Sequence, residues 1–209
     1  PAPAVQWLTP SHDSLGLEPL FLAVFDQRID PDAVLAVTTL SHGGQDVALR
    51  LATENEIEGD EQLSGVFERQ VEGTWVAFRA VDAFDPDTAI SVVIGPSVPS
   101  TEGPNTTDAV FTEEMRTYAP LRIEGQSCNP SDDCQPDRGF GVWFNNSLDA
   151  ESLEAGDLVF EPEIPGAFIR INGSSIDVSG SIKGDTVYKM TVPASLTDTF
   201  EQTLGEDQV

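Results

Sequence analysis

One phrase occurs twice in this chain of 209 residues and constrains the fold more than any other feature of the sequence. Residues 20–34 read LFLAVFDQRIDPDAV, and residues 139–153 read GFGVWFNNSLDAESL. Four pairs share one offset of 119 residues: Phe21 with Phe140, Phe25 with Phe144, Ile29 with Leu148, and Asp30 with Asp149. Each copy reads as an apolar strand, a short polar step, and an apolar anchor followed by Asp. Such repetition predicts two copies of one structural module.

A second phrase is repeated later in each copy. Residues 87–95 read DTAISVVIG and residues 185–193 read DTVYKMTVP, at an offset of 98 residues. The two offsets differ by 21 residues, so the first copy contains about that much extra sequence. We expect the extra stretch in the acidic region around Glu54 to Gln70. Within it, residues 54–61 hold five acidic side chains in eight positions, which predicts a solvated loop.

Short apolar or alternating segments at fairly even spacing, with turn residues between them, predict β-strands along the whole chain. We expect strands at 5–8, 20–25, 37–40, 46–53, 75–81, 90–94, 111–118, 121–123, 140–144, 158–160, 167–171 and 175–178, and a late strand within the phrase at 185–193. No long apolar pattern with a period of 3.6 residues occurs, so helix should be minor. The pattern is typical of an antiparallel β-sandwich, and its repetition predicts an all-β chain with two such sandwiches in tandem.

The repeated phrase also predicts individual residue roles. Period-two alternation would turn one set of side chains inward in each copy: Phe21, Ala23 and Phe25, and Phe140, Val142 and Phe144. Ile29 and Leu148 would anchor the turn below the strand. Asp30 would be the N-cap of a single helical turn, with Pro31 at its first position and Asp149 as the counterpart of Asp30.

The boundary between the two sandwiches is expected near residue 117. We place the first domain at 1–117, with the acidic insertion and a closing linker, and the second at 118–209, with a cysteine loop. Residues 96–107 are rich in Pro, Ser, Gly and Thr, which suits either a linker or a long strand-to-strand crossing. We therefore expect the domains to be joined between about Pro96 and Pro120.

The charge of the chain is extreme, with 36 acidic residues against 10 basic residues and a net charge of −26. Such a surface repels nucleic acid and anionic membranes, so we expect neither as a partner. Two explanations of this acidic surface remain open, namely a solubility adaptation and an acidic docking face. Residues 1–117 hold 20 acids and residues 118–209 hold 16, and this even spread favours the solubility interpretation because a docking face would be concentrated.

The sequence contains no membrane-crossing or targeting segment. No apolar run approaches the ~18 residues that a membrane helix needs, so we expect no direct membrane insertion. No signal peptide is recognisable. The chain starts at Pro1 without Met, and we expect it to be a piece of a longer protein.

Cys128 and Cys134 are the only cysteines, and five residues separate them. A pair that closes a small polar loop suits an oxidising compartment, and we predict a disulfide between the two. Free thiols and a metal site remain alternatives, although a metal site would need more thiols or histidines at ligand spacing.

No catalytic constellation is recognisable, and we predict no catalytic, cofactor-binding or metal-binding residues and no enzymatic activity. His12 and His42 both lie in turn-like segments, without a neighbouring pattern that marks a nucleophile, and we expect exposed loop histidines. No glycine-rich motif that could cradle a phosphate occurs.

Three acidic groups suggest calcium, because hard cations take several oxygen ligands. They are Asp30 with Asp32, Asp85 with Asp87, and Asp132 and Asp133 with Asp137. None follows a full calcium-loop pattern, and Asp30 already has a capping role. Asn105, Asn145 and Asn172 each begin a glycosylation pattern, which would be coincidental in a bacterial protein, the interpretation we favour.

Two phrases of the second copy resemble bacterial Ig-like modules. They are FNNSLD at 144–149 and DTVYKMTV at 185–192, although Ser147 stands where Pro is usual. The stretch IGPSVPSTEGP at 94–104, followed by TYAPLRI at 117–123, resembles the N-terminal part of bacterial alpha-2-macroglobulins. In that family, such a segment runs between two tandem Ig-like domains, and the second domain often carries a cysteine pair. The resemblance covers most of the chain.

The resemblance implies two Ig-like sandwich domains of a protease inhibitor that traps its target. Proteins of that family lie in the bacterial periplasm or at the cell surface and offer a bait region to a protease, in many members with a Cys–Gln thioester. Neither Cys128 nor Cys134 begins a Cys-x-Glu-Gln motif, so the bait and any thioester would lie outside this sequence. The expected partners are other domains of the same chain and, through the full-length protein, a target protease. The alternative is a pair of repeat modules from a bacterial surface or adhesion protein, or an accessory region of a secreted enzyme.

Overall fold

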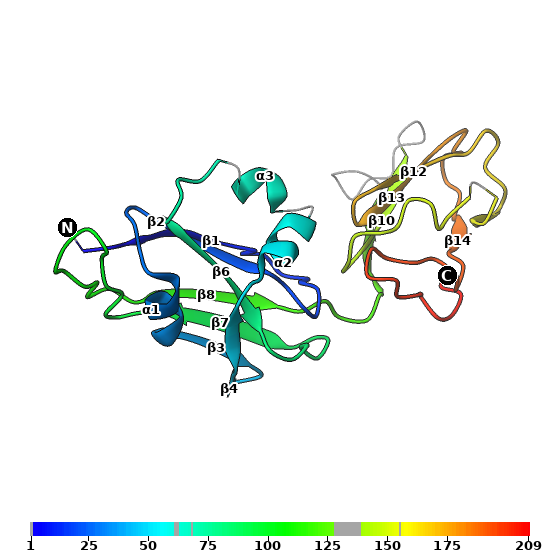
Figure 1. Cartoon of the computed structure of the whole chain (residues 1–209). Coiled ribbons are helices and arrows are strands. Elements are labelled where there is room, and N and C mark those ends of the chain that lie inside the picture. The colour runs from blue at the N-terminus through cyan, green and yellow to red at the C-terminus, as the bar shows by residue number, and fades with distance from the viewer. Residues whose placement is uncertain (1, 61–62, 68, 128–138, 155) are drawn as a thin grey trace. The chain divides into compact units, whose positions relative to one another are not determined.

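The computed structural model describes residues 2–60, 63–67, 69–127, 139–154 and 156–209. The chain divides into two compact units, Pro1–Tyr118 and Ala119–Val209. In each unit the strand pairs are antiparallel, and the described helices, all in the first unit, are short (Figure 1). The predicted all-β class with antiparallel sheets is therefore confirmed.

The first unit is built from two four-stranded sheets that face each other across a core. One sheet has the order β1 (Val5–Thr9), β2 (Phe21–Phe25), β6 (Trp75–Ala80), β5 (Leu49–Leu51). The other has the order β4 (Gln45–Val47), β3 (Thr38–His42), β7 (Ala89–Ile94), β8 (Phe111–Arg116). Phe21, Ala23 and Phe25 pack in one cluster with Leu40 of β3 and Val92 of β7, so the predicted inward face of β2 is confirmed.

The outer face of β2 is buried as well. Leu22 and Val24 pack in a separate apolar cluster with Leu63 and Ala77. Two short helices, α2 (Glu54–Gly59) and α3 (Ser64–Phe67), lie over this side of the sheet, opposite β3 and β7 (Figure 1). Burial of this face removes apolar surface from water, which is the main favourable contribution to folding.

The prediction of a solvated loop at residues 54–61 is therefore wrong in its first part. Thr53 caps α2 with a capping box, in which its side chain accepts from the Glu56 N–H and the Glu56 side chain accepts from the Thr53 N–H. Ile57, placed among the acids, packs against the outer cluster together with Phe67. Glu54 and Glu58 face solvent while the few apolar side chains cover the sheet, a division that a count of charges does not reveal.

The helical turn after β2 forms as predicted. Helix α1 (Pro31–Ala36) has Asp30 as its N-cap and Pro31 at its start. The carboxylate of Asp30 accepts from the backbone N–H of Asp32 at 3.0 Å and of Ala33 at 3.4 Å. These bonds satisfy amide groups that have no partner within the helix.

Two other predicted strands need correction, and the structure decides between the linker and the crossing predicted for residues 96–107. The strand expected at 46–53 is two strands, β4 and β5, that belong to different sheets. The segment at 96–107 is a crossing inside the first unit, because the Ser97 N–H donates to the Thr107 carbonyl at 2.7 Å and Val98 is fully buried. The strand expected at 121–123 begins instead at Ile123 and continues as β9.

The second unit has a four-stranded sheet and a two-stranded sheet. The larger sheet has the order β12 (Phe168–Asn172), β13 (Ser175–Ser179), β10 (Phe140–Phe144), β9 (Ile123–Ser127). The smaller one pairs β11 (Val159–Glu161) with β14 (Lys189–Thr191). Val142 and Phe144 are buried in one core with Ile176, and Phe140 packs against it while partly exposed. The inward face of β10 is thus as predicted, although its first residue lies at the rim.

Among the described residues, no helix is long and apolar enough to cross a membrane.

Candidate functional site

The first copy of the repeated phrase is fixed to a tight turn that comes before β6. The Phe25 N–H donates to the Thr74 carbonyl at 2.8 Å, and the Ile29 N–H donates to the Gly73 carbonyl at 2.9 Å. Gly73 has φ +81°, a conformation that residues with a side chain rarely adopt. Phe25 and Ile29 are both 4% exposed, so the turn closes the strand over the core.

The second copy makes the same bonds at the equivalent turn before β13. The Phe144 N–H donates to the Ser174 carbonyl at 2.8 Å, and the Leu148 N–H donates to the Gly173 carbonyl at 2.9 Å. Gly173 also has a positive φ, +58°. Phe144 is 3% exposed and Leu148 is 5% exposed. The predicted equivalence of the two strand ends and of their apolar anchors is confirmed.

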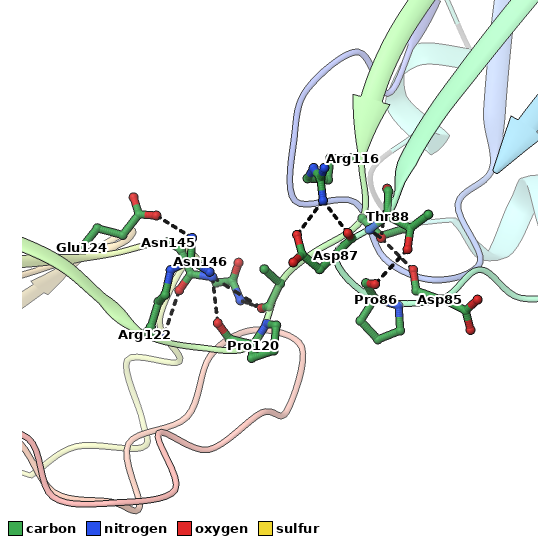
Figure 2. Close-up of polar contacts among 12 residues, drawn as sticks. Asp85, Pro86, Asp87, Thr88, Arg116, Pro120, Arg122, Glu124, Asn145 and Asn146 are labelled. Atoms are coloured by element: carbon green, nitrogen blue, oxygen red, sulfur yellow. Dashed lines mark hydrogen bonds and ion pairs between the residues drawn. The ribbon is translucent and has the colours of Figure 1, made fainter. Parts of the chain in front are cut away.

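A third element of the repeat lies at the residue after each strand. In the first unit the Asp26 N–H donates to the Ala4 carbonyl at 3.1 Å, and the Ala4 N–H donates to Asp26 Oδ1 at 2.8 Å. In the second unit the Asn145 N–H donates to the Arg122 carbonyl at 3.3 Å, and the Arg122 N–H donates to Asn145 Oδ1 at 2.8 Å (Figure 2). The side chain of Asp26 or Asn145 thus holds the start of each unit beside the end of its second strand.

The later repeated phrase begins with an unusual backbone conformation in both units. Asp87 has φ +52° and Asp185 has φ +50°. The hydroxyl of Thr88 donates to the carbonyl two residues earlier at 2.9 Å, and the hydroxyl of Thr186 does the same at 3.0 Å. Asp is one of the few residues that enter the left-handed region with little strain, so the repeated Asp-Thr pair encodes one turn.

The extra sequence of the first unit lies between Asp30 and Gly73. The offset between equivalent residues falls from 119 at Asp30 and Asp149 to 100 at Gly73 and Gly173, so 19 extra residues lie between these points. This interval contains α2 and α3, and no helix occurs in the described residues of the second unit. The insertion therefore supplies α2 and α3, which cover the outer face of the sheet that contains β2; we call these two helices the cover.

One acidic side chain fixes this cover to the sheet. Glu56 Oε1 of α2 lies 2.6 Å from Arg50 Nη2 and 2.7 Å from Arg79 Nη1. These contacts, led by the hydrogen bond from Arg50 and followed by those from Thr53 and Arg79, hold the pKa of Glu56 well below its usual range. The same carboxylate raises the pKa of Arg50. An insertion with a large negative charge is thus anchored through two of the ten basic residues of the chain.

The last residues of the first unit are held within that unit. Thr117 is 1% exposed, and its hydroxyl donates to the Asp85 carbonyl at 2.7 Å and accepts from the Thr88 N–H at 2.9 Å (Figure 2). The Tyr118 carbonyl accepts from the Asp87 N–H at 2.8 Å. Arg116 adds an ion pair to the carboxylate of Asp87 at 2.6 Å.

The first residues of the second unit are held by a buried polar cluster. The Ala119 carbonyl accepts from Asn146 Nδ2 at 2.8 Å and from Gln202 Nε2 at 3.1 Å. Both amides also donate to Asp198 Oδ2 at 2.8 Å, and Asp198 is 2% exposed. Asn145 Nδ2 donates to the Pro120 carbonyl at 3.0 Å (Figure 2). Tyr118 and Ala119, adjacent in the chain, are thus each anchored in a different unit.

The two histidines have different environments. His12 is exposed in a bend, as predicted. His42 is not an exposed loop residue, because it belongs to β3, stacks on Phe84 with ring centroids 5.1 Å apart, and is 17% exposed. Its Nε2 accepts from the Asp85 N–H at 3.0 Å. Gly43 and Gly44 after it form a turn, and β3 extends two residues beyond the strand expected at 37–40.

The acidic groups considered for calcium do not form a site in the part of the chain that the structure describes, where no three His, Cys, Asp or Glu residues gather. Asp30 is occupied as an N-cap and Asp87 pairs with Arg116. Asp132, Asp133 and Asp137 lie outside the described residues, as do Cys128 and Cys134, so the disulfide stays a prediction. Of the three glycosylation patterns, Asn145 is engaged in hydrogen bonds, and Asn105 and Asn172 are exposed.

Sequence reasoning missed the turn residues that complete each module. Gly73-Thr74 and Gly173-Ser174 each precede a strand that pairs with the repeated phrase, and a search for matching glycines would have found them. The buried Asp198 cluster had no such signal, because its partners are 52 and 4 residues away in the sequence.

Comparisons with known proteins add little beyond this geometry. No family model and no curated protein matches the chain. Among solved structures, native alpha-2-macroglobulin from Escherichia coli, spanning domains MG0-NIE-MG1, is 14% identical with a TM-score of 0.34 and covers 81% of this chain. The LD transpeptidase LdtMt1, solved in complex with imipenem, is 12% identical with a TM-score of 0.35, and the match covers 97% of this chain and 79% of that chain. The present chain spans 45% of the length of the macroglobulin chain. At such TM-scores neither likeness supports an argument.

Proposed function

We propose that this chain forms two non-catalytic structural modules of a bacterial alpha-2-macroglobulin-like protease inhibitor. The observation that carries the proposal is the repeated turn, which makes the same backbone bonds at Phe25 and Ile29 as at Phe144 and Leu148. Tandem copies of one sandwich, together with the phrases at 94–104 and 117–123, match the expectation for that family. The backbone bonds of the repeat hold the strands of each unit together.

The modules would serve as scaffold in the periplasm or at the cell surface. Their partners would be other domains of the same chain, and a target protease would be engaged through the full-length protein. The bait and any thioester would be supplied by those other domains, because no Cys-x-Glu-Gln occurs in this sequence.

The test is a substrate-size assay on the protein that contains this chain. The protein is mixed with an equimolar amount of trypsin or elastase, and cleavage of casein and of a small chromogenic peptide is followed in parallel. A trap encloses its protease, so we expect casein cleavage to fall while peptide cleavage persists. The 209-residue chain alone is the control and should change neither rate.

Unchanged casein cleavage by the full-length protein would contradict the proposal. In that case the second candidate, repeat modules of a surface or adhesion protein or an accessory region of a secreted enzyme, becomes the better interpretation. The repeat itself favours this candidate, because arrays of one module are typical of such proteins. Further copies of the same two phrases elsewhere in the full-length protein would support it.

A further inference from the structure

The outer face of the larger sheet in the second unit differs from its covered counterpart in the first. We define this outer face by six residues that alternate with the core residues: Gly125, Gly141, Trp143, Phe168, Arg170 and Asp177. Trp143 is 39% exposed and Phe168 is 65% exposed. Large exposed aromatic side chains that share one face of a sheet mark a candidate interaction surface.

Two glycines on this face give room to the side chains beside them. Trp143 lies opposite Gly125 in the strand register. A Cβ atom on Gly125 would stand 2.5 Å from Cζ2, 2.6 Å from Cε2 and 2.8 Å from Nε1 of the indole. The indole therefore lies across Gly125, where its position is fixed by the sheet below it.

The second glycine gives room to a carboxylate. Asp177 lies opposite Gly141, and a Cβ atom on Gly141 would stand 3.2 Å from Asp177 Oδ1. The carboxylate thus leans over Gly141, toward the strand that carries Trp143. Because Trp143 and Gly141 are two residues apart on β10, Asp177 and Trp143 are diagonal neighbours, with backbones roughly 7–8 Å apart. The exposed indole over Gly125 and the exposed carboxylate over Gly141 therefore lie above two residues that are diagonal neighbours, with backbones roughly 7–8 Å apart.

The charge of the molecule restricts what can bind here. The outer face carries one acid and one base, in a chain with a net charge of −26. A second copy of the chain, a nucleic acid or an anionic lipid surface would be repelled by the rest of the molecule, whereas a basic partner would be attracted. A cation beside an indole gains a cation–π interaction, and guanidinium groups are the commonest cations in that role.

We propose that the outer face of the second unit binds a basic segment of another protein, with an arginine side chain on the indole of Trp143 and beside the carboxylate of Asp177. Phe168 provides apolar contact for a residue next to that arginine. Arg170 lies opposite Asp177 in the register and would repel a second cation, so the site takes a single arginine flanked by apolar residues. The inference does not depend on the proposed inhibitor function, because it concerns one face of one unit.

The test uses the whole 209-residue chain and the peptide acetyl-Gly-Leu-Arg-Leu-Gly-amide, with a peptide carrying Gln in place of Arg as the control. Binding is followed by the NMR shifts of the Gly125 and Gly141 amides, which remain observable in every variant. We expect shifts with the Arg peptide and much weaker shifts with the Gln peptide. Trp143→Ala and Asp177→Asn should each weaken binding about two- to five-fold, as expected for an exposed cation–π or charge pair.

Glu163→Gln is the matched control, because Glu163 is an exposed acid of the same unit that belongs to none of the strands of the larger sheet, and it should leave the affinity unchanged. Equal weakening by all three variants would show attraction to the acidic surface as a whole and would overturn the proposal. So would equal binding of the two peptides, or binding of a neutral oligosaccharide such as cellotetraose with no binding of the Arg peptide.

Discussion

The outer faces of the two equivalent sheets show how one module accepts two surfaces. In the first unit Leu22 and Val24 lie buried beneath α2 and α3. At the equivalent positions of the second unit stand Gly141 and Trp143, and in the described residues no helix lies over them. The inner face keeps large apolar side chains in both units. The repeat thus specifies the core and the turns of each unit, whereas the residues on the outer face of the sheet differ between the two units.

The cross-strand partners follow the same division. Val24 pairs with Trp75 in the first unit, and Trp143 pairs with Ser175 in the second. An apolar pair needs a cover, and the 19-residue insertion supplies it. The pair of Trp143 and Ser175 needs none, because Ser175 is polar and can be solvated. The insertion and the apolar outer face therefore belong together as one adaptation.

The largest expected effect comes from the shared inner face. Phe25→Ala and Phe144→Ala each remove a buried aromatic side chain and should each lower the free energy of unfolding of their own unit by about 3–5 kcal/mol. A typical domain has only ~5–15 kcal/mol in total. Calorimetry should show one transition lowered strongly and the other nearly unchanged in each variant. A strong effect of Phe144→Ala with none of Phe25→Ala would break the equivalence.

The outer faces should respond unequally to truncation. Leu63→Ala removes a side chain that is 7% exposed under the cover, and should cost the first unit about 2–3 kcal/mol. Trp143→Ala removes a 39% exposed side chain and should cost the second unit about 1 kcal/mol or less. Urea unfolding monitored separately for each unit measures both values. Equal costs would mean that the outer face of the second unit is as essential to its fold as the covered one.

The helix caps provide a smaller contrast within the repeated phrase. Asp30 caps the six-residue helix α1, so Asp30→Ala should cost about 1 kcal/mol. Asp149 accepts from the Glu151 N–H at 3.0 Å in a turn that does not continue as a helix, so Asp149→Ala should cost less. Chemical denaturation of the two single variants tests the order of the two effects, and a larger cost for Asp149→Ala would reverse it.

The stability that Glu56 contributes by fixing α2 to the sheet should depend on pH. Because contacts with Arg50, Thr53 and Arg79 lower the pKa of Glu56 in the folded state, its contribution to stability is present above the ordinary carboxylate pKa. That contribution is lost as the pH falls below about 4 toward the lowered pKa. Glu56→Gln should therefore lower the melting temperature of the first unit by a constant amount between pH 7 and 5, and by less at pH 3. A difference that grows on acidification would contradict the role of this ion pair.

The sequence predicts those parts of the fold in which a local pattern of residues is compatible with only one structure. Asp30 before Pro31 gave a helix start, and alternation in β2 gave the inward face. The strand at 46–53 was misread because a change of sheet at Ala48 alters no pattern of hydrophobicity. The acidic insertion was misread because a few apolar residues, such as Ile57, decide its burial while many charges dominate its composition.

The candidate site was less predictable than the fold. Its anchors join residues far apart in sequence, as in the bond of Asn146 to Asp198, which no local spacing reveals. The sequence predicts an exposed loop position for His42, whereas in the structure it completes β3 and packs on Phe84. The outer face of the second unit could not be predicted, because the need for a glycine at position 125 becomes evident only once the indole of Trp143 is seen to lie across it.

Native-state hydrogen exchange at two backbone amides tests the central claim most directly. Ile29 and Leu148 lie beyond the ends of β2 and β10, where an amide without a partner would exchange at the rate of an open loop. Because both donate at 2.9 Å to the carbonyl of a turn glycine, the amides of both residues should be protected to a degree comparable with Phe25 and Phe144. Rapid exchange of either amide, with its neighbouring strand still protected, would show that the two units do not share the repeated turn.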